Sequence, residues 1–581
     1  MKRTAAALLI LGALVPTGAR AAVDVPCVST PRLPANPLFQ IQEQAFGFHD
    51  EELVICSPGA DNPTHIAARL WVPRGCPGVG GCAGVVIGHG FGFSKELTFA
   101  DMYALVGKGL YVLSYDVRGQ GTSGGQAELL GRDDVADQAA VLAWWHENVQ
   151  PTKTAFYGIS QGGWLSWTAA VYNCGAARAA SFDSDIPCDQ GGRWIDAIAP
   201  MQGPTATIDD GTCTLFAIEA IAESRANLGL VQSMASCPID GRPGPIPGAF
   251  VDVSQRFGRI DVPVYAVTSF YDRLVPARQT TAAYERLHVR TLDPGDVMYG
   301  KDVRLTLSND AHGDVGGNLA VTGDVFAWIK QVIDGGPALR DATVAIAQEW
   351  AGNTFRLEDA WPIPGTTMQT LHLARGSAGE LAAAPCGAAP DELRNLPVLA
   401  SGPSEPFIGS LELNNATEIP DVRLVYTTPP FAETTEITGE PSATIYVSSA
   451  NAQSSGNGQL NIGLSELAPD GSAHEFSHAR IGLTGLGPDP VVVHVPLSIA
   501  SHRIDVGNAL MLVITPSDIA VALPAPGIDP WYVHHDAAAP SSIALPVVPV
   551  DRTQPSGQPP SGSSYTDDPT GAICGALNLP C

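Results

Sequence analysis

The chain has 581 residues, of which 45% are hydrophobic and 16% are charged, and its formal net charge at pH 7 is −27. This apolar content is enough for a large core, and single cores rarely grow beyond about 250–300 residues, so we expect two domains. An acidic surface of this kind repels nucleic acids and anionic membranes, which excludes nucleic-acid binding as the function.

The first residues have the pattern of a secretory signal peptide. Lys2 and Arg3 form a positive segment, residues 5–15 are an apolar run, and residues 19–21 (ARA) fit a small-x-small cleavage site. The apolar run is too short to span a bilayer. We therefore expect cleavage near Ala21 and a soluble mature protein, secreted or periplasmic, without a membrane partner.

The sequence contains 11 cysteines, and none of them lies in a CxxC pair. In an exported chain this favours disulfides over zinc, and the odd number leaves one thiol over. Connectivity does not follow from sequence, but four pairs lie close enough along the chain to be plausible: Cys76/Cys82, Cys174/Cys188, Cys213/Cys237 and Cys574/Cys581. We expect no metal and no cofactor.

Residues 22–340 are predicted to form an α/β domain. Apolar runs typical of buried parallel strands alternate with helical patterns, as at residues 133–148 and 318–334. The strand-like runs are residues 84–90, 110–116, 154–158 and 262–272. Residues of about 204–259 interrupt this alternation with two cysteines and the sequence GRPGPIPG, and we expect them to form an inserted cap.

From about Gly336 onward the helical periodicity fades. Short strand-like runs separated by Pro, Gly, Asn and Asp turns predict an all-β sandwich over residues 341–550. Residues 551–581 form a Ser/Pro/Gly-rich, flexible tail that contains the last two cysteines. No internal repeat is found.

The sequence FYGISQGGW (156–164) places Ser160 in a G-x-S-x-G pattern. A predicted strand precedes it and a helical pattern follows, so Ser160 lies on a strand-to-helix turn. A sharp turn at this point exposes the hydroxyl, and small flanking residues permit the close backbone approach that it needs. The pattern therefore predicts a nucleophile. The alternative is a glycine-rich turn with a capping serine.

A serine nucleophile needs a base, and the base needs an acid to orient it. In this fold class the chain order is Ser, then Asp or Glu, then His. Asp272 ends a predicted strand and His312 follows the next one, in a polar, Gly-flanked loop. We predict that these two residues complete a triad with Ser160. Asp310 is the rival acid, but it is too close in sequence to face the imidazole.

An acyl-transfer site also needs donors for the oxyanion. We expect the backbone N–H groups of Phe91 and Gln161 to supply them, and a structural role for His89. The sequence GQGTSG (119–124) matches a dinucleotide fingerprint, but no convincing ribose-binding acid or βαβ unit accompanies it. The tripeptide HHD (534–536) is interpreted as surface rather than as a metal site.

These motifs together resemble the cocaine esterase / X-Pro dipeptidyl-peptidase family of α/β-hydrolases. The resemblance rests on YDVRGQGTSGG (115–125), GISQGG (158–163), and the two β-rich segments 437–472 and 494–518, which are similar to the jelly-roll domain of that family. It implies an α/β-hydrolase domain with an inserted cap, followed by an all-β jelly-roll domain, and it extends over roughly residues 64–549. It also implies Ser160 as nucleophile, Asp272 as acid and His312 as base.

One departure from the family pattern affects the oxyanion site. Members of the cocaine esterase type carry a tyrosine two residues before a lysine, and its hydroxyl donates to the oxyanion. Here the lysine is Lys95 and the matching position is Phe93, so backbone donors are expected. The Pro-specific peptidases bind a free amine with acidic residues of the cap. Glu219 and Glu223 could do this, although a solvated helix face is the simpler interpretation.

The sequence thus predicts an exported serine hydrolase that cleaves carboxylic esters or related acyl compounds, without a cofactor. Its expected partners are small acyl substrates or short peptides. The alternatives are an X-Pro dipeptidyl-peptidase and, as a non-enzyme, a carbohydrate-binding protein on an inert hydrolase scaffold. Acyl preference and oligomeric state do not follow from the sequence.

Overall fold

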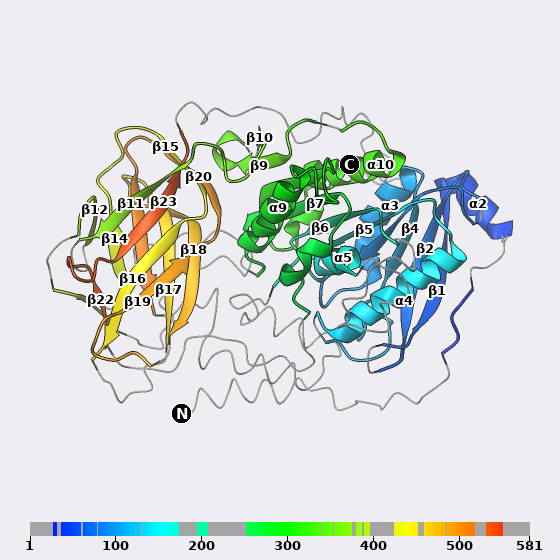
Figure 1. Ribbon diagram of the computed structural model, residues 1–581, viewed down its shortest axis with the longest axis horizontal. Coiled ribbons are helices and arrows are strands. Elements are labelled where there is room, and N and C mark those ends of the chain that lie inside the picture. Colours follow the sequence, from blue (N-terminus) through cyan, green and yellow to red (C-terminus); the bar gives the residue numbers. More distant parts are fainter. Residues whose placement is uncertain are drawn as a thin grey trace.

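The structure is a computed structural model in which two sheet-based domains lie side by side (Figure 1). It describes residues 27–31, 37–59, 62–172 except 78 and 129, 194–206, 251–374 except 273, 339 and 353, 379–385, 389–394, 423–450, 458–516 except 484, and 530–549.

The first domain is built on a sheet that has ten strands within these residues, in the order β1-β2-β4-β3-β5-β6-β7-β8-β9-β10. The strands from β4 to β9 run parallel, whereas β1, β2 and β10 join the edges as antiparallel neighbours. Their bounds are β1 Phe48–Ser57, β2 Thr64–Pro73, β3 Gly84–Gly88, β4 Tyr111–Tyr115, β5 Thr154–Ile159, β6 Ala197–Met201, β7 Val264–Tyr271, β8 Val303–Ala311, β9 Val344–Gln348 and β10 Thr354–Glu358.

Helices cover both faces of this sheet, which explains why its parallel strands are apolar along their whole length. Apolar residues of α4, α5 and α9 share one core with the sheet, and those of α3 and α10 share a second core on the other face. The helix bounds are α2 Pro37–Phe46, α3 Phe99–Gly107, α4 Arg132–Asn148, α5 Gln161–Val171, α9 Ala277–Thr291 and α10 Leu319–Asp334, with short 3-10 turns η1 Lys95–Thr98, η3 Ser254–Arg259, η4 Asp314–Gly317 and η5 Glu349–Ala351.

The predicted parallel sheet with helices on both faces is therefore confirmed. The sheet continues through β9 and β10 to Glu358, beyond the position 340 at which we placed the end of the first domain. Figure 1 shows these two strands at the edge of the sheet that faces the second domain. Most of the predicted cap, residues 207–250, lies outside the described residues.

The second domain is all-β, as predicted. Strands β16, β22 and β23 contribute to the same apolar core as β14, β17 and β21, which is the packing of a β-sandwich. Among the described residues of this domain, all strand pairs are antiparallel except β12 with β14. The bounds are β11 Thr367–Leu373, β12 Gly379–Ala382, β13 Asp391–Arg394, β14 Leu424–Thr427, β15 Thr435–Gly439, β16 Ser442–Ser449, β17 Gly458–Leu467, β18 Ala473–Leu483, β19 Val491–Pro496, β20 Ala500–Ile504, β21 Ala509–Thr515, β22 Pro530–His534 and β23 Ser542–Val547.

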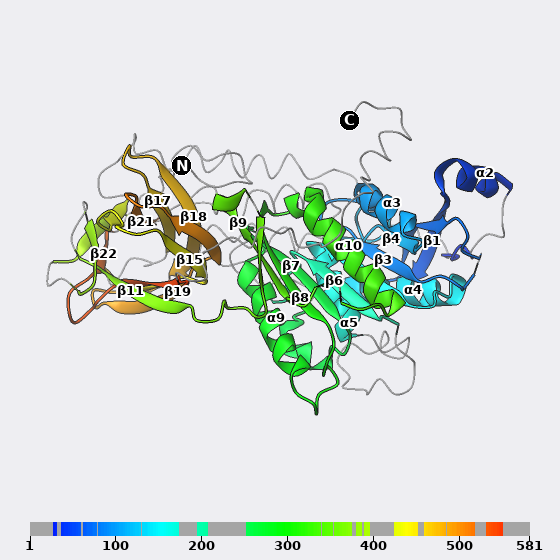
Figure 2. The same cartoon turned by 90° about the horizontal axis from the view of Figure 1, so that it is seen from above.

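The two domains meet where β20 contacts β9 and η5 and where β18 contacts β7. Figure 2 shows β9 at this junction, between the β-sandwich and the rest of the first domain. Arg356 of β10 donates two hydrogen bonds, of 2.6 and 2.8 Å, to the carboxylate of Glu436 in β15. Both side chains are buried, so this ion pair is part of the contact between the domains rather than a surface pair.

Two disulfides join described cysteines. Cys76–Cys82 is one of the plausible pairs from the sequence, and Cys27–Cys56, which we did not predict, ties the N-terminal segment to β1. The other three predicted pairs lie outside the described residues. Among the described helices, none is both long and apolar enough to cross a bilayer.

Candidate active site

Ser160 lies on a sharp turn between β5 and α5. Its backbone angles are φ 58° and ψ −117°, a conformation that costs energy for any residue with a side chain and that clusters at functional sites. The flanking glycines make the turn possible. A methyl group at Gly162 would lie 1.9 Å from the carbonyl oxygen of Gly88, and one at Gly158 would lie 2.5 Å from the backbone of Gly162.

His312 follows β8 and faces Ser160. Its Nε2 lies 2.9 Å from the Ser160 hydroxyl oxygen, and its Nδ1 lies 2.8 Å from Oδ2 of Asp272. Because a carboxylate can only accept, Nδ1 carries the proton of the neutral imidazole. Nε2 is then left with a lone pair that can accept the proton of the Ser160 hydroxyl.

Asp272 is held rigidly at the end of β7. Its side chain is inaccessible to solvent, and its second oxygen, Oδ1, accepts backbone hydrogen bonds of 2.9 Å from Leu274 and 2.8 Å from Val275. Both bonds fix the carboxylate plane, so Oδ2 remains directed at the imidazole. The structure thus brings Ser160, His312 and Asp272, predicted from motif and chain order, into one hydrogen-bonded chain.

The two expected oxyanion donors are Phe91, in the loop after β3, and Gln161, the first residue of α5, which directly follows Ser160. Within the described part of the chain, neither the Phe91 nor the Gln161 N–H has an acceptor. Gly90 adjoins the nucleophile, because a methyl group there would lie 3.6 Å from the β-carbon of Ser160. Both N–H groups are therefore without an acceptor among the described residues, in segments that adjoin Ser160.

Gln120, which we did not single out from the sequence, connects the two segments that carry these donors. Its side-chain oxygen accepts from the N–H of Gly92 at 2.7 Å, and its amide donates to the side-chain oxygen of Gln161 at 2.9 Å. Gln120 belongs to the GQGTSG segment, so one function of that loop is to connect the segments that carry Phe91 and Gln161.

Gln202, also not predicted, supports the histidine. It follows β6 with a positive φ of 46° and is fully buried. Its oxygen accepts from the N–H of Gly313 at 2.7 Å, and its amide donates to the carbonyl of Ala311 at 2.9 Å and to Ser269 at 2.8 Å. The residues on both sides of His312 are therefore fastened to one side chain.

Two models of known protein families match this chain, and both describe domains of X-Pro dipeptidyl-peptidases. Residues 47–186 match the model of the X-Pro dipeptidyl-peptidase (S15 family), and residues 338–545 match that of the X-Pro dipeptidyl-peptidase C-terminal non-catalytic domain. The two ranges together cover more than half of the chain and follow each other in the order seen in the structure. The chain belongs to the S15 family of serine hydrolases.

Solved structures share the whole two-domain fold with this S15 chain. An aminopeptidase from a marine sediment Thaumarchaeota archaeon is 15% identical, with 92% of this chain and 100% of that chain covered and a TM-score of 0.65. An α-amino acid ester hydrolase is 14% identical over 91% and 100%, with a TM-score of 0.63. A CocE/NonD family hydrolase from Staphylococcus aureus is 12% identical over 89% and 99%, with a TM-score of 0.59. No curated protein sequence is close enough to match.

Asp310 and His89, which the sequence analysis also considered, make hydrogen bonds outside the triad of this S15 chain. Asp310, the rival acid, accepts a 3.0 Å hydrogen bond from Asn318 at the start of α10. His89 accepts from the Val117 N–H at 2.9 Å and contacts the Gly90 carbonyl at 2.7 Å. Burial lowers its pKa, against the effect of the Gly90 contact, so the ring stays neutral and structural.

The fingerprint-like loop 119–124 surrounds a carboxylate of the chain itself. Asp116 accepts from the backbone N–H groups of Thr122 and Lys95 at 2.7 and 2.6 Å, and from the Lys95 ammonium at 3.1 Å. A methyl group at Gly121 would lie 2.3 Å from this carboxyl group. The glycine is thus explained by close packing on Asp116 rather than by a phosphate.

The HHD tripeptide does not converge on one point. His534 bonds to Ser448 at 2.9 Å, buried His535 lies 3.3 Å from Asp391, and Asp536 accepts from the backbone of the following turn.

Phe93 is 42% exposed beside Gly90. Glu219 and Glu223 lie outside the described residues.

Proposed function

We propose that Ser160 is the nucleophile of this hydrolase, with His312 as general base and Asp272 as the acid that orients it. The observation that carries the proposal is the hydrogen-bonded chain from Ser160 through His312 to Asp272, with distances of 2.9 and 2.8 Å, at a serine held in a strained turn. A buried acid stabilises the imidazolium that forms when the histidine accepts the serine proton.

The reaction then follows from the positions of these groups. Ser160 attacks an acyl carbonyl while its proton passes to Nε2 of His312, and the leaving group departs with that proton. The N–H groups of Phe91 and Gln161 receive the negative charge that develops on the carbonyl oxygen. Water then attacks the acyl-enzyme while its proton passes to Nε2 of His312. This step releases the acyl group and restores Ser160.

We propose carboxylic esters as the substrate class. Phe93 places an exposed aromatic ring next to Gly90, the residue that adjoins the nucleophile, and this ring would provide apolar surface for an acyl group. It has no hydroxyl for the oxyanion, so the site depends on backbone donors. An X-Pro dipeptidyl-peptidase is the second candidate, because the matched family model bears that description.

We also propose that the protein is exported. The basic and apolar N-terminal segment has the pattern of a signal peptide, and the Cys27–Cys56 and Cys76–Cys82 disulfides are typical of an oxidising compartment. N-terminal sequencing of the protein from culture medium or periplasm tests this. A start near residue 22 is expected, and an intact Met1 on intracellular protein would contradict it.

The proposed function is tested by comparing initial rates on p-nitrophenyl butyrate and on Ala-Pro-p-nitroanilide. We expect fast ester cleavage, a silent anilide, and loss of turnover and of fluorophosphonate labelling in Ser160→Ala. Ser472→Ala, in an exposed turn of the β-sandwich, is the matched control. Strong anilide cleavage would favour the peptidase and direct attention to Glu219 and Glu223. Wild-type protein that the probe does not label would support an inert binding scaffold.

A further inference from the structure

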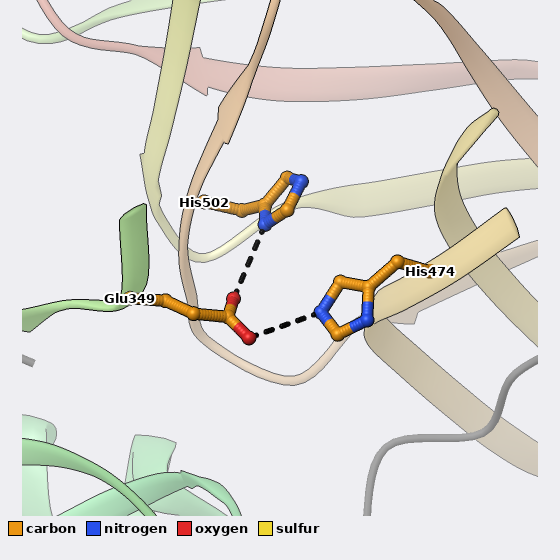
Figure 3. Close-up of side chains that lie close together, drawn as sticks. All are labelled: Glu349, His474 and His502. Atoms are coloured by element: carbon orange, nitrogen blue, oxygen red, sulfur yellow. Dashed lines mark ion pairs between the residues drawn. The ribbon is translucent and has the colours of Figure 1, made fainter. Parts of the chain in front are cut away.

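Three side chains converge where the β-sandwich contacts the first domain (Figure 3). They are Glu349 of η5, His474 of β18 and His502 of β20, and their ligand atoms all lie within 4.8 Å of one another. They come from three distant segments of the chain, and none belongs to the proposed active site.

Both contacts of the Glu349 carboxylate have the spacing of neighbouring ligands around a small divalent cation. Nε2 of His474 lies 3.2 Å from Oε1 of Glu349, and Nδ1 of His502 lies 3.5 Å from Oε2 of the same carboxylate. Zinc binds nitrogen and carboxylate oxygen at about 2.0–2.2 Å in tetrahedral geometry, which separates neighbouring ligand atoms by about 3.4 Å. Two imidazoles and a carboxylate are also ligands that zinc accepts.

His502 provides a second, independent indication. Its residue is 6% exposed, and its Nδ1 is buried without a hydrogen-bond partner among the described residues. Its other nitrogen, Nε2, lies 2.9 Å from Oε2 of Glu466 and donates to that carboxylate in the neutral ring. In the neutral ring the lone pair of Nδ1 therefore faces the lone pairs of Glu349, and a cation between them, either a metal ion or a proton, offsets this repulsion.

The contact between His502 and Glu466 is the kind of support that metal-binding histidines receive. Such residues commonly donate their free ring N–H to a carboxylate, which fixes the tautomer and raises the basicity of the ligand. Glu466 is itself held, because Oε1 accepts from the Asp505 N–H at 2.9 Å and from the Asn508 amide at 2.7 Å.

Tyr271 brings a fourth group to the same place. Its hydroxyl lies 3.0 Å from Oε2 of Glu349 and 3.2 Å from Nε2 of His474. Tyr271 is the last residue of β7 and directly precedes Asp272. The side chains of Glu349 and His474 are 34% and 30% exposed, so an ion can enter from solvent.

We propose that Glu349, His474 and His502 bind one divalent ion of the zinc class, with the Tyr271 hydroxyl or a water molecule as fourth ligand. The ion joins β18 and β20 of the sandwich to the sheet that carries Asp272. Its role is to hold the two domains together, and it takes no part in the acyl-transfer chemistry. The proposal therefore stands whether or not Ser160 is the nucleophile.

Cobalt(II) titration of the untagged, metal-stripped protein tests the proposal, because four-coordinate Co²⁺ has intense visible absorption. We expect one ion per chain with such a band, displacement of the band by Zn²⁺, and a higher unfolding temperature with Zn²⁺ than without. Absence of the band, or a weak band typical of six-coordinate cobalt at surface carboxylates, would overturn the proposal.

Variants locate the ion. Glu349→Gln and His474→Ala should lose the band, and Glu466→Gln should weaken affinity about 10- to 100-fold while keeping all ligands. His494→Ala removes a histidine of β19 outside the cluster and should bind normally. Circular dichroism checks that each metal-free variant is folded. A band that survives in Glu349→Gln, or that disappears in His494→Ala, would contradict the assignment.

Discussion

The side-chain oxygen of Gln202 accepts a 2.7 Å hydrogen bond from the N–H of Gly313, the residue that follows His312. The amide of the same side chain donates to the carbonyl of Ala311, the residue that precedes it. A buried side chain at the end of β6 thereby fixes the backbone on both sides of the proposed base, although β7 lies between β6 and β8 in the sheet.

Gln202→Met should keep the shape of this side chain and remove its hydrogen bonds. We expect kcat to fall on the order of 10- to 100-fold with little change in KM, because His312 would no longer be held at the distance that proton transfer needs. Gln331→Met is the control, since it removes a similar amide-to-backbone hydrogen bond near the C-terminal end of α10, to the carbonyl of Gly336. Equal kcat values for the two variants would refute a positioning role for Gln202.

Asp272→Asn should abolish most activity without unfolding the protein. The asparagine oxygen can still accept from Leu274 and Val275, but its NH2 group would then face Nδ1 of His312. The imidazole would be forced into the tautomer with its proton on Nε2, which cannot accept from serine. We expect kcat to fall about 10⁴-fold.

Asp310→Asn is the matched control for this prediction, because Asp310 is the acid two residues from the histidine. Its carboxylate accepts from Asn318 and does not contact the imidazole. Its kcat should stay close to that of the wild type, as a steady-state ester assay would show. A large loss in Asp310→Asn with an active Asp272→Asn would reverse the assignment of the acid.

The positions of Ser160, Asp272 and His312 followed from sequence because each has a local signal. The elbow has its glycines, and the acid and base end apolar strand-like runs in the required chain order. Parallel strands bring their carboxyl ends to one edge of a sheet, so residues far apart in sequence meet there without any further information.

Gln120 and Gln202 were missed because their roles depend on contacts between loops. Gln202 follows β6, a strand of five residues that contains a proline and gives little periodicity. Strands β1, β2, β9 and β10 were also missed or misplaced, since edge strands join the sheet as antiparallel neighbours of a parallel core. The Glu349–His474–His502 cluster has no spacing motif, because one 3-10 turn and two strands, far apart in the sequence, supply one ligand each.

Gly162→Ala should strongly destabilise the protein. The new methyl group would lie 1.9 Å from the carbonyl oxygen of Gly88, and neither backbone can move without separating α5 from β3. We expect a loss of at least about 3 kcal/mol or failure to fold. Gly107→Ala, at the end of α3 with nothing within 4 Å of the new methyl, should be neutral or slightly stabilising. Thermal unfolding of both variants decides; similar unfolding temperatures would refute the packing argument.

The free energy of unfolding of the first domain should decrease as rising pH removes the proton from Asp134, a buried carboxyl in α4. Burial raises the pKa of Asp134 to about 8, and the nearby Asp137 adds to this effect against the hydrogen bond from Gly131. The folded state therefore holds a proton that the unfolded state releases near pH 4. The stability from this group is complete below about pH 4 and is lost progressively up to about pH 8.

Asp134→Asn removes this titration while its oxygen can still accept from the Gly131 N–H. The unfolding temperature of the variant relative to wild type should therefore be higher at about pH 9 than at about pH 5. Glu380→Gln, which removes an exposed carboxyl in the β-sandwich, should show no such change. A difference for Asp134→Asn that is constant across this range would contradict the prediction.

The ion pair between Arg356 and Glu436 should show the asymmetry of buried charges. Among the described residues, Arg356→Met leaves the buried Glu436 with only the Thr438 hydroxyl as a side-chain donor, and we expect a loss of about 3–5 kcal/mol. Arg356→Met combined with Glu436→Leu removes both charges, so it should recover most of that loss. Calorimetry of the two variants tests this, because the domains share this contact. If the double variant is as unstable as the single one, the packing of the two side chains, rather than the unpaired charge, determines the stability of the interface.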